Sequence, residues 1–150
     1  MGEGMATAER RADVVWNGNL QSGSGTFDLA SSGAWTGANV SWATRTENPN
    51  GNTSPEELIA AAHASCYAMA LSNVLHEGGN DAEELRISAT CVLDLGSVKI
   101  TSEVLDVHGR VPGLDAEGFQ QAVEQADQAC PVTNALRGSA DIQVNATLEQ

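Results

Sequence analysis

Apolar and polar residues alternate in several short runs of this chain, a pattern typical of β-strands. Residues rich in Gly and Ser separate the runs and indicate turns. Before a central apolar segment the runs lie at 13–16, 26–29 and 38–45, and after it at 87–95, 98–107 and 140–148. We therefore predict three strands before the central segment and three after it.

The central segment 55–77 predicts one long helix. Ser54 suits the N-cap, Pro55 suits the first helical position, and Gly78 ends the segment. Residues 58–75 are apolar almost all round, and most are small. Such a helix is usually buried on every side against another helix, which in a chain of this length can belong to a second subunit.

A second helix is predicted at 116–130. Asp115 can cap its start, and Pro131 forces a break or a restart of the helix. Apolar residues at helical spacing form one face, namely Phe119, Ala122, Val123, Ala126 and Cys130. The order βββ-α-ββ-α-β indicates an α+β fold in which strands and helices are segregated.

Length and composition favour a single folded domain. The 150 residues are 41% hydrophobic and 18% charged, enough to bury a core. We expect a flexible lead at 1–12 and one domain at 13–150. The net charge of −13 disfavours nucleic acid and anionic membranes as partners. No secretory signal and no apolar run of membrane-spanning length is visible, so we expect a cytoplasmic location.

Three cysteines are the candidate reactive groups. Their odd number, without CxxC or zinc-like spacing, predicts neither a disulfide framework nor a metal or cofactor site. Cys66, in the long helix, is either a small buried hydrophobe or a nucleophile. Cys91 alternates with apolar residues in a strand and is interpreted as a core residue. Cys130 is either a packing residue or a thiol beside free N–H groups of a new helical turn after Pro131.

Three other residues can act on Cys66. His63 lies one helical turn before it, but residues at this spacing often miss hydrogen-bond geometry, so a structural role is favoured over a Cys–His pair. Arg45, predicted at the end of the third strand, can lower the pKa of a thiol without taking its proton. Glu56 can hold a guanidinium by a bidentate bond. Taken singly, Arg45 is a surface charge and Glu56 compensates the helix dipole.

Five stretches together resemble the OsmC/Ohr family of thiol-dependent peroxidases. They are Thr44–Glu47, Asn52–Ile59, Ala60–Ala70, Val111–Asp115 and Ala129–Val132. The resemblance extends from about residue 13 to the end of the chain. It implies an OsmC-like α+β fold and an intertwined two-fold dimer with central buried helices. Residues 62–66 are more similar to the OsmC branch than to the Ohr branch.

The resemblance also implies a role for each of four residues. Cys66 matches the peroxidatic cysteine, Cys130 the resolving cysteine, Arg45 the arginine that activates the thiol, and Glu56 its carboxylate partner, whereas Cys91 matches no functional position. The implied activity is reduction of organic hydroperoxides, with hydrogen peroxide as a further candidate substrate. It needs no cofactor and proceeds through a sulfenic acid and an intramolecular disulfide. A dithiol or lipoyl-type reductant would reset the disulfide.

Helix geometry adds a prediction about assembly. Glu56 and Cys66 are ten residues apart, about 15 Å along a helix, so one arginine cannot bridge both unless the helix bends. We therefore predict that Arg45 and Glu56 of one subunit meet Cys66 of the other in an obligate homodimer. Two alternatives remain open: a non-catalytic redox-sensing or ligand-binding dimer on the same fold, and a protein whose three thiols are inert to peroxide.

Overall fold

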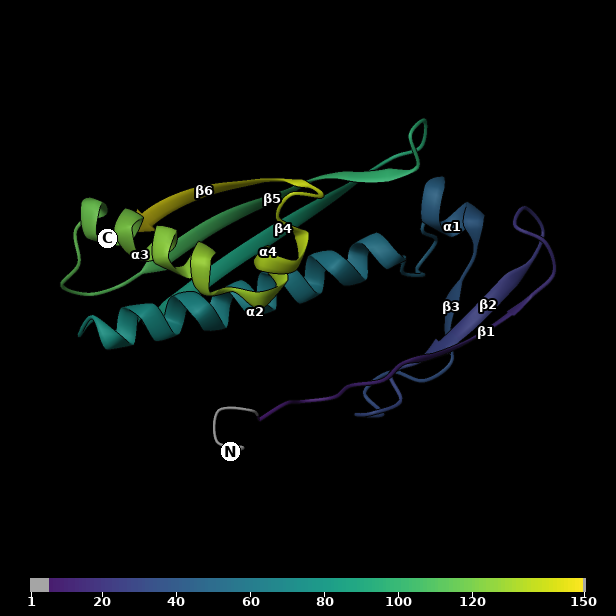
Figure 1. Cartoon of the computed structure of the whole chain (residues 1–150), viewed down its shortest axis with the longest axis horizontal. Helices are drawn as coiled ribbons and strands as arrows, with labels where there is room; N and C mark the ends of the chain where they lie inside the picture. The colour runs from purple at the N-terminus through teal and green to yellow at the C-terminus, as the bar shows by residue number, and fades with distance from the viewer. Residues whose placement is uncertain (1–5, 150) are drawn as a thin grey trace. The chain divides into compact units, whose positions relative to one another are not determined.

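The computed structural model describes residues 6–149, and the chain divides into two units, at 1–55 and 56–150. Figure 1 traces the elements of both. Residues 1–5 of the expected N-terminal lead lie outside the described residues, and residues 6–12 form no helix or strand. The observed elements contain the predicted order βββ-α-ββ-α-β, with two additional short helices.

The N-terminal unit contains a three-stranded antiparallel sheet. Its strands are β1 (Asp13–Asn17), β2 (Ser24–Asp28) and β3 (Ala38–Val40), paired in that order. Phe27 of β2 is buried, and Trp35 packs edge-on against it with ring centroids 5.5 Å apart. Every residue of β1 is exposed, including its large apolar side chains.

The prediction of a strand through residues 38–45 is wrong in its second half. Trp42–Thr46 form the short helix α1. Its N-cap is Ser41, whose hydroxyl accepts from the Thr44 N–H, and the Thr44 hydroxyl accepts from the Ser41 N–H, each at 3.2 Å. This reciprocal capping box satisfies two backbone donors at once and outweighs the alternation of apolar residues.

The C-terminal unit begins with α2, the predicted long helix, at Pro55–Glu77. Its buried side chains lie mainly at four-residue spacing on one face: Glu56, His63, Tyr67, Leu71 and Leu75. The other faces are only partly covered within this chain. The length and mean hydropathy of α2, 1.4, would also suit a membrane span, but a core helix of a soluble protein has the same signature.

A second three-stranded sheet completes the C-terminal unit. Strand β4 (Glu84–Asp94) pairs antiparallel with β5 (Lys99–Arg110), which pairs parallel with β6 (Asp141–Glu149). Parallel neighbours require a crossover connection, and helices α3 (Ala116–Ala129) and α4 (Pro131–Leu136) lie within it. Helix α4 is the restart after Pro131 that the sequence allows.

One hydrophobic core joins α2, α3 and one face of this sheet (Figure 1). The Tyr67 hydroxyl donates to the Val123 carbonyl oxygen at 2.9 Å, so α2 and α3 are also tied by a buried hydrogen bond. A Cβ at Gly109 would lie 2.6 Å from the Phe119 ring, so glycine is needed where α3 meets β5. This packing fixes the end of α3, and with it Cys130, against α2.

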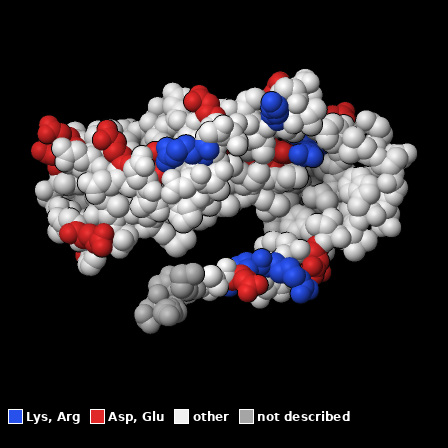
Figure 2. Space-filling model, in the orientation of Figure 1, with Lys and Arg blue, Asp and Glu red and all other residues white. Residues whose placement is uncertain are grey.

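Charged side chains lie in small groups on the surface. On the face shown in Figure 2, basic groups lie beside acidic ones, further acidic groups stand apart, and no broad basic area is visible. Arg86, Arg110 and Arg137 each pair with a carboxylate of the C-terminal unit, at 3.1 to 3.3 Å. Neighbouring carboxylates therefore compensate the charge of these three arginines.

Candidate active site

Two of the three cysteines come together in the C-terminal unit. Cys66 projects from α2 and packs against the core that contains Cys130, at the junction of α3 and α4, and the Cys130 thiol is close enough to affect the pKa of Cys66. Both thiols are free. Cys130 is fully buried, whereas Cys66 is partly exposed. Of the two residues, Cys66 is therefore the one that remains partly open to a solvent-borne reactant.

The first turn of α4 positions both sulfur atoms. Cys130 is the C-cap of α3 and also the N-cap of α4, with Pro131 at the first helical position. The Cys130 Sγ accepts from the Thr133 N–H at 3.5 Å. The preceding N–H, that of Val132, lies close enough to the Cys66 sulfur to lower the pKa of that thiol. Because the first N–H groups of a helix lack intrahelical partners, the two sulfurs share these donors between them.

The surroundings of Cys66 within this unit favour its protonated form. Burial raises the pKa of the Cys66 thiol above its ordinary value, and the Val132 N–H opposes this effect. The hydrogen bond and charge of Cys130 raise the pKa further. A thiol that reacts as a thiolate near neutral pH needs a cation to lower its pKa. The C-terminal unit thus assembles the sulfur pair without lowering the pKa of Cys66.

Arg45 and Glu56 lie in different units. Arg45 is in the last turn of α1 rather than at the end of a strand, and its guanidinium carbon is 5.7 Å from the centroid of the Trp42 ring. Glu56 is buried in the first turn of α2. Since α2 is unbroken, about 15 Å of helix separates Glu56 from Cys66. Their roles as activating arginine and carboxylate partner stay predictions.

Cys91 has different neighbours. It faces the side of β4 that the sequence pattern makes apolar, and it pairs across the sheet with Glu103 of β5. Burial, contact with the Glu103 carboxylate and the charge of Glu56 raise the pKa of Cys91 to about 12. A thiol beside carboxylates stays protonated at neutral pH. This environment supports the structural interpretation of Cys91.

A buried polar cluster adjoins the sulfur pair and was missed by sequence reasoning. His63 Nδ1 lies 2.8 Å from Glu103 Oε1, and His63 Nε2 lies 2.7 Å from Thr133 Oγ1. All three side chains are fully buried. Both ring nitrogens of His63 are therefore engaged elsewhere, which agrees with the structural role favoured over a Cys–His pair with Cys66.

One member of this cluster carried a signal in the sequence. Glu103 occupies the same side of its strand as Leu105 and Val107, both fully buried. A carboxylate at an inward position of an alternating strand indicates a buried polar partner, because an unpaired buried charge is very unfavourable. For Thr133, the only signal in the sequence is its position three residues after Cys130.

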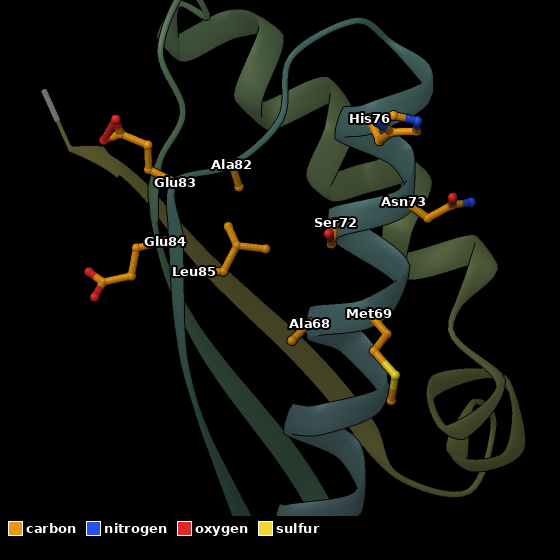
Figure 3. Close-up of a pocket in the computed structure, with 9 residues that line it drawn as sticks. All are labelled: Ala68, Met69, Ser72, Asn73, His76, Ala82, Glu83, Glu84 and Leu85. Atoms are coloured by element: carbon orange, nitrogen blue, oxygen red, sulfur yellow. The ribbon is translucent and has the colours of Figure 1, made fainter.

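A pocket of about 520 Å³ opens beside α2 (Figure 3). Four residues of its wall, Ala82, Glu83, Glu84 and Leu85, come from the start of β4 and the segment before it, and the rest come from α2. Met69 of α2 also lines the pocket and is 68% exposed. Neither Cys66 nor Cys130 lines the pocket. Within residues 6–149, no group of three or more His, Cys, Asp or Glu side chains is arranged to hold a metal.

Two neighbouring free thiols, one partly exposed and one buried, on an α+β scaffold define the class of a candidate two-cysteine redox protein. Residues 48–145 match the family described as OsmC-like protein, and the chain belongs to this family. Peroxiredoxin OsmC of Escherichia coli (strain K12) is 35% identical over 133 residues, which are 87% of this chain and 92% of that protein. Organic hydroperoxide resistance protein-like 2 of Staphylococcus epidermidis (strain ATCC 12228 / FDA PCI 1200) is 35% identical over 108 residues, 65% of this chain and 70% of that protein.

Solved structures share the fold at low sequence identity. An organic hydroperoxide resistance protein OsmC from Legionella pneumophila has a TM-score of 0.72 at 21% identity and covers 95% of this chain and 98% of its own. An OsmC-like protein from Mycoplasma pneumoniae has a TM-score of 0.76 at 15% identity, covering 97% and 100%. These similarities confirm the predicted OsmC-like α+β fold.

Proposed function

We propose that this protein is a thiol-dependent hydroperoxide reductase that detoxifies organic hydroperoxides. The observation that carries the proposal is the contact between a partly exposed Cys66 thiol and a buried Cys130 thiol. Membership of the OsmC family supports it, as do relatives named peroxiredoxin and organic hydroperoxide resistance protein. Hydrogen peroxide is a second candidate substrate.

The proposed chemistry has two oxidative steps. The Cys66 thiolate attacks the distal oxygen of the hydroperoxide: an S–O bond forms, the O–O bond breaks, and the alcohol leaves after taking up a proton. The Cys130 sulfur then attacks the Cys66 sulfenic acid. An S–S bond forms, the S–O bond breaks, and hydroxide leaves with the Cys130 proton as water. The exposure of the two sulfurs suits this order, since peroxide can reach Cys66 and not Cys130.

The catalytic cycle closes by reduction of the disulfide. A dithiol or lipoyl-type reductant attacks one sulfur through a mixed disulfide, becomes oxidised itself and restores both protein thiols. The partial exposure of Cys66 makes it the sulfur that such a reductant can reach. A cytoplasmic location belongs to the same proposal, because free thiols persist in a reducing compartment.

Activation and assembly form one further part of the proposal. The pKa of Cys66 is raised within its own unit, so the reaction needs a cation, and we assign this role to Arg45, oriented by Glu56.

The apolar α2 is covered mainly on one face, and Met69 and β1 expose apolar side chains. A second copy of the chain would cover them, with the two α2 helices antiparallel. Sedimentation of a dilute sample as a monomer would contradict the obligate homodimer.

A reductant-coupled assay over cumene hydroperoxide, tert-butyl hydroperoxide and hydrogen peroxide tests the proposal. Repeated turnover, fastest with an organic peroxide, is the expected result. A single stoichiometric oxidation would instead identify a redox sensor. Three thiols that do not react with any of these peroxides would reject both functions.

A further inference from the structure

A buried hydrogen bond joins the two elements that carry the sulfur pair. His63 lies three residues before Cys66 on α2, and Thr133 lies three residues after Cys130 on α4. The His63 Nε2 to Thr133 Oγ1 distance is 2.7 Å. The backbone N–H of the same Thr133 donates to the Cys130 Sγ. The hydrogen bond therefore joins α2 to α4, the same elements that carry Cys66 and Cys130. On α2 it lies one helical turn before Cys66.

Glu103 fixes the orientation of the His63 ring. Its Oε1 lies 2.8 Å from His63 Nδ1, where a carboxylate can only accept, so Nδ1 carries a proton and donates. The ring is then held in the plane that directs Nε2 at the Thr133 hydroxyl. Because Glu103 belongs to β5, this contact fixes the ring to the sheet, so it does not depend on α2 alone.

Burial of this polar cluster is energetically unfavourable. His63, Glu103 and Thr133 are all fully buried, and the second carboxylate oxygen, Glu103 Oε2, has no hydrogen-bond partner among the described residues. Apolar side chains of similar volume would avoid this desolvation. The Thr133 hydroxyl is also inaccessible to any substrate, although hydroxyl, imidazole and carboxylate stand in the order of a hydrolytic triad. A role in positioning accounts for the arrangement.

We propose that His63, held by Glu103, is a positioning residue for disulfide formation. By binding Thr133 it holds the first turn of α4 against α2, which keeps the Cys130 sulfur within reach of the Cys66 sulfenic acid. The inference rests on the proposed peroxidase function and concerns its second step alone. Attack of peroxide on Cys66 does not need Cys130 in place, whereas formation of the S–S bond does.

The two steps separate in a single-turnover experiment. One equivalent of cumene hydroperoxide is mixed with the reduced protein, dimedone traps the Cys66 sulfenic acid at successive times, and mass spectrometry quantifies the Cys66–Cys130 disulfide. Thr133→Val keeps the shape of the side chain and removes the hydroxyl. We expect sulfenic acid to form within about twofold of the wild-type rate. We expect the disulfide to form at about one tenth of the wild-type rate or below it. Thr133→Ser keeps the hydroxyl and should restore the disulfide rate.

The other outcomes overturn the proposal in distinguishable ways. An unchanged disulfide rate in Thr133→Val would show that the hydrogen bond does not position Cys130. Equal slowing of both steps would show a general structural role. If Thr133→Val does not fold, Thr133→Ala takes its place, since it also removes the hydroxyl, with the same separation of rates expected and the same results contradicting it. Failure of the wild-type Cys66 to oxidise would instead reject the proposed function.

Discussion

The C-terminal unit holds cysteines in two contrasting places, the start of α4 and the middle of β4. At the start of α4, backbone N–H groups of Val132 and Thr133 face the sulfurs of Cys66 and Cys130. In β4, Cys91 meets the carboxylate of Glu103 and the charge of Glu56. The first environment supplies partial positive charge, which opposes the rise in the pKa of Cys66, and the second supplies negative charge, which adds to the rise in the pKa of Cys91.

The two places differ in the groups that face the sulfur atom. Cys91 lies in β4, the edge strand that pairs with β5 alone, and the charged groups near it are the carboxylates of Glu103 and Glu56. A helix start has N–H groups without intrahelical partners, and the break at Pro131 creates such a start beside two thiols. Burial raises the pKa of both Cys66 and Cys91; a backbone N–H opposes this effect at Cys66, whereas carboxylates add to it at Cys91.

The largest effect should come from removing the exposed thiol of the pair. Cys66→Ser should abolish peroxide turnover, a loss of about three orders of magnitude or more, because a hydroxyl does not replace the thiolate as nucleophile. A coupled assay with tert-butyl hydroperoxide measures the loss. Cys91→Ser is the matched control and should retain turnover within about twofold. Full activity in Cys66→Ser would show that Cys66 is not the nucleophile, and it would contradict the comparison of the two cysteine environments.

The second effect concerns intrinsic reactivity. Raising the pKa of a thiol moves thiolate formation to higher pH, and with a pKa of about 12 the thiolate fraction of Cys91 at pH 8 is roughly a thousandfold below that of an ordinary cysteine. Cys91 should therefore resist iodoacetamide at pH 8 in the native protein. In urea, where Glu103 no longer faces it, Cys91 should react at the rate of a free thiol. Rapid native alkylation at Cys91 would contradict the assigned environment.

The third effect is the identity of the disulfide. Protein treated with peroxide should contain a bond between Cys66 and Cys130, because these thiols are already in contact. Peptide mapping without reduction identifies the linked pair. Cys130→Ser should stop at the sulfenic acid, detectable with dimedone. A bond to Cys91 would show that the contact in the structure does not determine the pairing.

The smallest effect tests the cation outside the C-terminal unit. Arg45→Ala should raise the pKa of Cys66 by removing a positive charge, and should slow its alkylation at pH 7 roughly three- to tenfold. The pH profile of alkylation measures the shift. Arg45→Lys keeps the charge and should lie between the two. An unchanged profile in Arg45→Ala would assign the activation of Cys66 to the α4 N–H groups alone.

Local patterns predicted most of the fold, and a specific local signal explains where they were wrong. Alternation found β4, β5 and β6, and the N-cap and closing glycines marked α2. Residues 42–46 also alternate, yet they form a helix because Ser41 and Thr44 complete a capping box. Alternation and capping compete over short distances, and two satisfied backbone donors outweighed the pattern.

The candidate site was predictable only in part. The family resemblance named both Cys66 and Cys130, and the break at Pro131 indicated free N–H groups beside Cys130. The partners of His63 could not be predicted in the same way, because Glu103 and Thr133 lie 40 and 70 residues away in the chain. The inward position of Glu103 signals a buried carboxylate without saying which group pairs with it.

The sequence by itself determined the order of elements and the family, and it named the cysteines that we propose to react, because these depend on short-range patterns and local motifs. Only the tertiary structure decided that one turn of α4 serves both sulfurs, that carboxylates surround Cys91, and that His63 binds Thr133. These contacts form when α2, β5 and the α3–α4 junction pack around one core. Packing brings together groups whose separation along the chain carries no information about their distance in space.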